Sequence, residues 1–169
     1  PGEIAEIASD RVYPPLGGQA GVVGVLSVDG EAIEVVTEDG SGPEGMGPIE
    51  RIPLTSGRPE AEVIRSEHPV LLGSPDAMRA SFPDGTEPAE GSPGRSWAGV
   101  PLTASGRTIG IVCVSYSEPQ AFDDRQVVEL RSVADQLALA LERSILQRSR
   151  EEAVRLDARV ERVKAVSEA

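Results

Sequence analysis

The 169-residue sequence predicts an α+β fold, in which an antiparallel sheet has both faces covered and a long helix ends the chain. An apolar run over 20–28, Asp-Gly at 29–30 and a second run over 32–36 form the pattern of a β-hairpin. Residues 108–116 are apolar without polar alternation, which is typical of a strand covered on both faces. Residues 120–169 contain neither Gly nor Pro, as expected for one long helix.

Composition excludes several classes of function. The formal net charge of −12 at pH 7 argues against nucleic-acid binding, which requires a basic face. No apolar run is long enough for a transmembrane helix, and no signal peptide is visible, so no membrane association is expected. The single cysteine, Cys113, permits no internal disulfide, and a cytoplasmic location is the default. Since the chain starts with Pro1, we expect it to be part of a longer protein.

Two short helices and a further strand are expected in the middle of the chain. Prolines delimit one helix over 59–68 and another over 75–82, because proline is favoured in the first turn of a helix and ends a helix before it. A strand is expected over 97–102, and a short amphipathic helix before Tyr13. The inner faces of the two middle helices are expected to carry Val63, Ile64, Ala77, Met78 and Phe82.

The terminal helix shows two apolar patterns. Asp123 and Gln126 have capping-box spacing, so the helix is expected to start near Asp124; unbroken, it would have about 45 residues and a length near 70 Å. It is densely apolar over 127–145, which suits packing onto a sheet and a partner together. From Leu146 onward a weak seam with coiled-coil spacing remains. We therefore expect a homodimer through Leu137, Leu141, Ile145, Leu146, Ala153, Leu156, Val160 and Val163.

Few residues offer catalytic or metal chemistry. His68 is the only histidine and Cys113 the only cysteine, so no metal site of the usual kind is expected. The glycine-rich stretch 40–47 lacks the Lys-Ser/Thr that follows in a phosphate-binding loop. Asp123 and Asp124 are adjacent carboxylates, but helix capping explains them and Gln126 together. We expect no catalytic residue in this chain.

The order of elements, with motifs near the end of the chain, resembles a known family. Residues 97–112 contain Pro-Leu, a turn with Gly-Arg and an apolar-Gly-apolar triplet; Phe-Asp-Asp at 122–124 and Ala-Leu-Glu-Arg at 140–143 follow. Together these motifs resemble a GAF domain, over about residues 4–146. Residues 51–83 are similar to actinobacterial GAF sensors that precede metal-dependent serine/threonine phosphatase domains of the stage II sporulation protein E type.

This resemblance implies a PAS-related, six-stranded antiparallel sheet with the first and last helices on one face. A small-molecule pocket roofed by the middle helices would occupy the other face. The implied function is sensory or regulatory: residues 1–146 would bind a small molecule or partner, and 147–169 would be a coiled-coil-like helix leading to a covalently linked output domain. The cysteine that tethers bilins, the complete cyclic-nucleotide motif and the cysteines of sulfoxide-reducing members are absent, so the resemblance identifies no cofactor.

The implied pocket residues come from the middle helices and the last two strands. They are Val63, Ile64, Met78, Phe82, Trp97, Ile111 and Cys113. If the strand parity is inverted, Val112 and Val114 line the pocket instead. Trp97 could be core or pocket wall, and Cys113 a small core residue or a thiol facing a ligand. The alternative function is a ligand-free dimerisation module, with the pocket filled by its own side chains.

Overall fold

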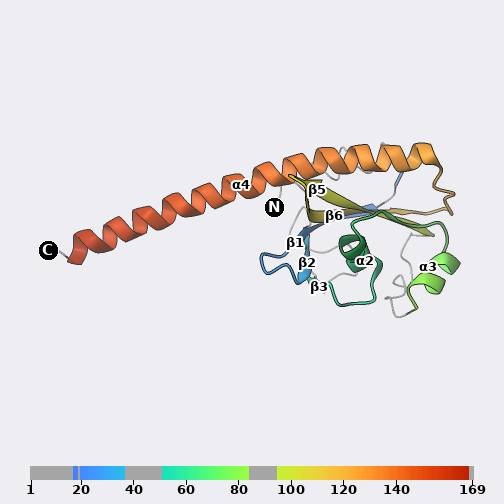
Figure 1. The fold of residues 1–169 in the computed structure, drawn as a ribbon, viewed down its shortest axis with the longest axis horizontal. Helices are drawn as coiled ribbons and strands as arrows, with labels where there is room; N and C mark the ends of the chain where they lie inside the picture. The colour runs from blue at the N-terminus through green and yellow to red at the C-terminus, as the bar shows by residue number, and fades with distance from the viewer. Residues whose placement is uncertain (1–16, 19, 37–50, 84–94, 168–169) are drawn as a thin grey trace.

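The computed structural model describes residues 17–18, 20–36, 51–83 and 95–167 (Figure 1). The helix expected before Tyr13 and the glycine-rich stretch 40–47 lie outside these residues. In chain order, the elements are β1 (Ala20–Leu26), β2 (Ala32–Val36), β3 (Arg51–Pro53), α2 (Pro59–Ser66), β4 (Val70–Leu72), α3 (Pro75–Ser81), β5 (Ser96–Ala104), β6 (Arg107–Tyr116) and α4 (Asp124–Ser167).

Six strands form one sheet in the order β3-β2-β1-β6-β5-β4, and all neighbouring strands are antiparallel. The expected hairpin β1–β2 is present, and β5 and β6 form a second hairpin across the turn that contains Gly-Arg. Each turn contains a glycine with positive φ, Gly30 at 72° and Gly106 at 73°, which is the conformation that only glycine adopts at little cost. The α+β fold class is therefore confirmed, and the strongest predicted strand, β6, lies in the centre of the sheet.

The two faces of the sheet carry separate apolar layers. The first part of α4 lies along one face, and α2 lies on the other (Figure 1). Along β6 the side chains alternate: Val112 and Val114 pack in the layer beneath α4, whereas Ile111 and Cys113 pack in the layer beneath α2. Because successive side chains of a strand point to opposite faces, α2 and α4 contact alternate residues of β6. Ile111 and Cys113 therefore face the middle helices, which is the first of the two parities considered above.

The two middle helices are anchored to different degrees. α2 begins with Pro59 and buries Ala61, Val63 and Ile64. α3 begins at the N-cap Ser74, whose Oγ accepts a hydrogen bond from the Ala77 N–H at 3.2 Å, and none of its residues is buried. The two helices therefore cover the same face of the sheet, but α2 contributes most of the burial.

α4 is one continuous helix of 44 residues, about 66 Å long at 1.5 Å per residue. The capping box is confirmed: the Gln126 N–H donates to Asp123 Oδ1 at 2.8 Å, and the Asp123 N–H donates to Gln126 Oε1 at 3.1 Å. The helix packs on the sheet through Leu130, Ala134, Leu137, Ala138 and Leu141, and the rest projects away from it (Figure 1). The boundary predicted at 146/147 falls inside this helix.

The structure corrects part of the predicted dimer interface. Leu137 and Leu141 are 2% and 1% exposed, because both pack against the sheet of their own chain. In the dense apolar stretch of α4, the sequence does not distinguish the face that packs on the sheet from the face that is exposed. Helical periodicity places Leu137 and Leu141 on the inner face, whereas Leu139 on the outer face is 54% exposed.

Candidate functional site

All seven predicted pocket residues lie in one apolar cluster between the sheet and the two middle helices. Val63 and Ile64 come from α2, Met78 from α3, Phe82 from the residue after it, Trp97 from β5, and Ile111 and Cys113 from β6. Sequence reasoning missed the members from β2, β3 and β4, namely Ile33, Val35, Ile52 and Leu72. Alternation in the hairpin strand could have identified Ile33 and Val35, whereas the two shorter strands carry no comparable pattern.

Side chains cover the floor of this cluster. A Cβ at Gly99 would lie 2.3 Å from Cη2 of Trp97 and 2.9 Å from Cγ2 of Val63, so the indole lies across Gly99 and against α2. A Cβ at Gly24 would likewise lie 2.4 Å from Cγ2 of Ile33. Trp97 is only 8% exposed. The two glycines leave no open space at the floor, because larger neighbours occupy it.

An ion pair lies beside the apolar cluster at the start of α2. Arg58 donates to Glu60 through Nη2 to Oε1 at 3.0 Å and through Nε to Oε2 at 3.2 Å, with side chains 18% and 16% exposed. Burial raises the pKa of the Cys113 thiol well above its usual value; the charge of Glu60 adds to this rise and that of Arg58 opposes it. Cys113 is therefore protonated at neutral pH and is a poor nucleophile.

His68 lies apart from this thiol, in the exposed turn between α2 and β4. Its Nδ1 is 2.5 Å from the carbonyl oxygen of Ser66, close to the end of α2. Across the residues that the structure describes, no group of three or more His, Cys, Asp and Glu side chains could hold a metal ion. Within the same ranges, no helix is long and apolar enough to cross a membrane.

A separate cavity of about 310 Å³ lies along the edge of β5. Its lining includes Glu67 and His68 from the turn after α2, Pro101 from β5, and Arg131 and Asp135 from α4. The four polar side chains among these are exposed, so water solvates them. The cavity is a weaker candidate than the apolar cluster, because ligand sites usually bury most of the ligand against apolar walls.

Comparison with protein families identifies the fold. A family model described as a GAF domain matches residues 1–142. The chain belongs to the GAF domain family. A comparison with curated proteins finds no match.

Solved structures of GAF domains have the same fold. The domain of an Acinetobacter phosphoenolpyruvate-protein phosphotransferase aligns with a TM-score of 0.62 and 16% identity, over 85% of this chain and 91% of that one. The second GAF domain of DevS from Mycobacterium smegmatis gives 0.58 and 19%, over 88% and 94%. Free methionine-R-sulfoxide reductase from Neisseria meningitidis gives 0.57 and 21%, over 86% and 78%. At these identities the likeness shows the fold alone.

The outer face of α4 is the second surface of interest in this GAF domain. Its exposed large apolar side chains are Val128, Leu139, Leu146 and Val154. Ile145, 39% exposed, follows Leu137 and Leu141 at four-residue spacing and so continues the inner face. Of the predicted interface residues, Ile145, Leu146 and Ala153 are exposed and accessible to a partner. The side chains of Leu156, Val160 and Val163 lie outside the described part of α4.

Proposed function

We propose that this GAF domain is a sensory or regulatory domain of a bacterial signal-transduction protein. It binds a small molecule or partner at the apolar cluster and relays that state through a dimeric α4 to a covalently linked output domain. The observation that carries the proposal is the double use of α4, which packs on the sheet through one face and exposes apolar side chains beyond it. The family supports it, since GAF domains are common in bacterial signalling proteins.

The proposed ligand site is supported by the difference in burial between the two middle helices that cover the apolar cluster. α3 has no buried residue, and Met78 and Phe82 are only partly buried against the cluster. Lifting α3 therefore costs less apolar burial than lifting α2. A small, largely apolar molecule would enter beneath α3 and contact Trp97.

The output end rests on the spacing of the outer face of α4. Leu139, Leu146 and Ala153 fall seven residues apart, and Val160 continues the series in the sequence. This seam extends back over the part of α4 that lies on the sheet, through Leu139, which is exposed. A parallel homodimer would pair these positions with their equivalents and leave the sheet contacts intact.

We also propose the class of the output domain. The similarity of residues 51–83 to GAF sensors that precede phosphatases favours a metal-dependent serine/threonine phosphatase of the stage II sporulation protein E type. The GAF domain itself would have no catalytic role, because its one thiol is buried and protonated and its one described histidine lies elsewhere.

A second candidate function is a ligand-free dimerisation module. The packing of Trp97 across Gly99 favours it, because the protein's own indole occupies the space where the floor would otherwise open. In this alternative the domain only holds two copies of its output domain together.

Native mass spectrometry of the freshly purified chain separates the candidates. A dimer carrying extra mass is expected for the sensor, and the added mass gives the class of ligand. A dimer at bare polypeptide mass, with no change in unfolding temperature against a metabolite panel, would favour the assembly module. A monomer at high micromolar concentration would contradict both the relay through a dimeric α4 and the dimerisation module.

A further inference from the structure

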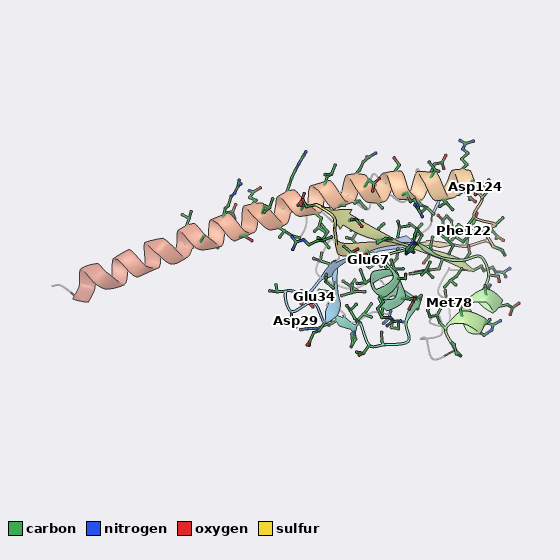
Figure 2. All side chains as sticks on the ribbon, in the orientation of Figure 1. Asp29, Glu34, Glu67, Met78, Phe122 and Asp124 are labelled. Atoms are coloured by element: carbon green, nitrogen blue, oxygen red, sulfur yellow. The ribbon has the colours of Figure 1, made fainter. Side chains whose placement is uncertain are left out.

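Two main-chain segments touch where β4 leads into α3. The Gln120 N–H donates a hydrogen bond to the carbonyl oxygen of Gly73 at 3.1 Å. A Cβ at Gly73 would lie 2.4 Å from the carbonyl oxygen of Gln120, so only glycine fits there. Gly73 precedes the N-cap of α3, and Gln120 lies in the segment that joins β6 to α4. Figure 2 shows that Met78 on α3 and Asp124 at the start of α4 lie at the same end of the molecule.

The contact continues into the first turn of α4. Gln126 Nε2 donates to Gln120 Oε1 at 3.1 Å. The Oε1 atom of the same Gln126 amide accepts the Asp123 N–H at 3.1 Å and so closes the capping box. One side-chain amide thus both holds Gln120 and caps the helix. A shift of Gln120 would disturb the cap of α4.

α3 is the roof element that opens most easily. It has no buried residue, whereas α2 has four. Local opening begins where few apolar side chains are buried, so opening α3 is expected to cost less free energy than opening α2. Its N-cap, Ser74, is the residue after Gly73, and opening of the first turn of α3 therefore acts directly on the contact with Gln120.

We propose that the contact between Gly73 and Gln120 couples the opening of α3 to the fraying of the first turn of α4. The use of this coupling in signalling rests on the proposed function, since it names the route from the roof of the site to the output helix. The coupling itself is a property of the ligand-free chain. It requires only that the opening of α3 shift the contact at Gly73 and, through Gln120, the cap of α4.

Amide hydrogen exchange on the full chain tests the coupling. Ser74→Ala removes the N-cap and is expected to raise the opening of α3 about fivefold. Coupling predicts that the amides of residues 127–130 also exchange faster, by about twofold or more. Gly73→Ala drives a Cβ against the Gln120 carbonyl and separates the two segments. In that background, Ser74→Ala should accelerate exchange in α3 alone.

Ser66→Gly is the matched control, because it places a poor helix former at the end of the other roof helix and removes the hydroxyl that donates to the Glu62 carbonyl oxygen at 2.8 Å. It should loosen the end of α2 and leave residues 127–130 unchanged. If Ser74→Ala loosens α3 without affecting 127–130, or if Ser66→Gly affects them equally, the coupling is wrong.

Two reserve variants and one further readout complete the test. Ala80→Gly, at an exposed position of α3, loosens that helix if Ser74→Ala does not. Gln120→Ala cuts the link to Gln126 if Gly73→Ala does not fold. Light scattering on the same samples gives the oligomeric state. A monomer with coupled exchange would contradict the dimeric relay and support the coupling. A dimer without coupled exchange would support the dimeric relay and contradict the coupling.

Discussion

Gly99 on β5 is a position where only a hydrogen atom fits, because the Trp97 ring and Val63 close over it. Gly99→Ala is expected to destabilise the domain by about 1–3 kcal/mol, since the ring or α2 must move. Trp97→Leu removes the obstructing ring, so the double variant should be more stable than the sum of the two single effects predicts. Urea unfolding of the four proteins measures this, and simple additivity would show that the indole does not lie across Gly99.

Asp29 in the β1–β2 turn has a pKa lowered to about 2. The largest cause is the hydrogen bond from Ser27 Oγ at 2.5 Å; the Glu31 N–H and Arg51 also contribute. Because the folded pKa is lowered, the stabilisation is present above the unfolded value near 3.8 and is lost as pH falls toward 2. Asp29→Asn should therefore be less stable than the parent at pH 6, with the gap narrowing below pH 4. A gap that stays constant down to pH 2 would contradict this.

Cys113 shows how burial decides whether a thiol reacts. Burial raises its pKa, so native protein at pH 8 should react with a soluble disulfide reagent at least tenfold more slowly than protein unfolded in guanidinium. Cys113→Ala, which leaves a small apolar residue, should keep the fold. Cys113→Asp should not, because it would bury a carboxylate in the apolar layer beneath α2. Rapid native labelling would show that the thiol faces an accessible cavity.

At the scale of elements, the proposed dimer depends on which face of α4 a side chain occupies. Leu146→Glu, on the outer seam, should weaken a homodimer at least tenfold, because it brings two like charges together. Val154→Glu is the matched control: it is also exposed on α4 and adds the same charge, but lies off the seam. Sedimentation equilibrium measures both. Equal weakening would show that charge on α4, not the seam, controls association.

Elements with local signals could be predicted from the sequence, and elements defined by their neighbours could not. The β1–β2 hairpin follows from Asp-Gly between apolar runs, and the start of α4 from its capping box. β4 has three residues and is a strand only because Val70–Leu72 pairs with β5. The inner position of Leu137 could not be predicted either, because apolar residues occur on both faces of the helix around it.

At the scale of the whole molecule, charge should oppose assembly. Each chain carries a net charge of −12, so two copies repel each other, while the seam that would join them is apolar. Raising the ionic strength from about 0.01 to 0.15 M shortens the screening length from about 30 to 8 Å. A seam-held dimer should therefore tighten severalfold over this range, as measured by sedimentation equilibrium. Weakening with salt would instead indicate an interface built on ion pairs between the charged flanks of α4. It would contradict a dimer held by the apolar seam through Leu139 and Leu146.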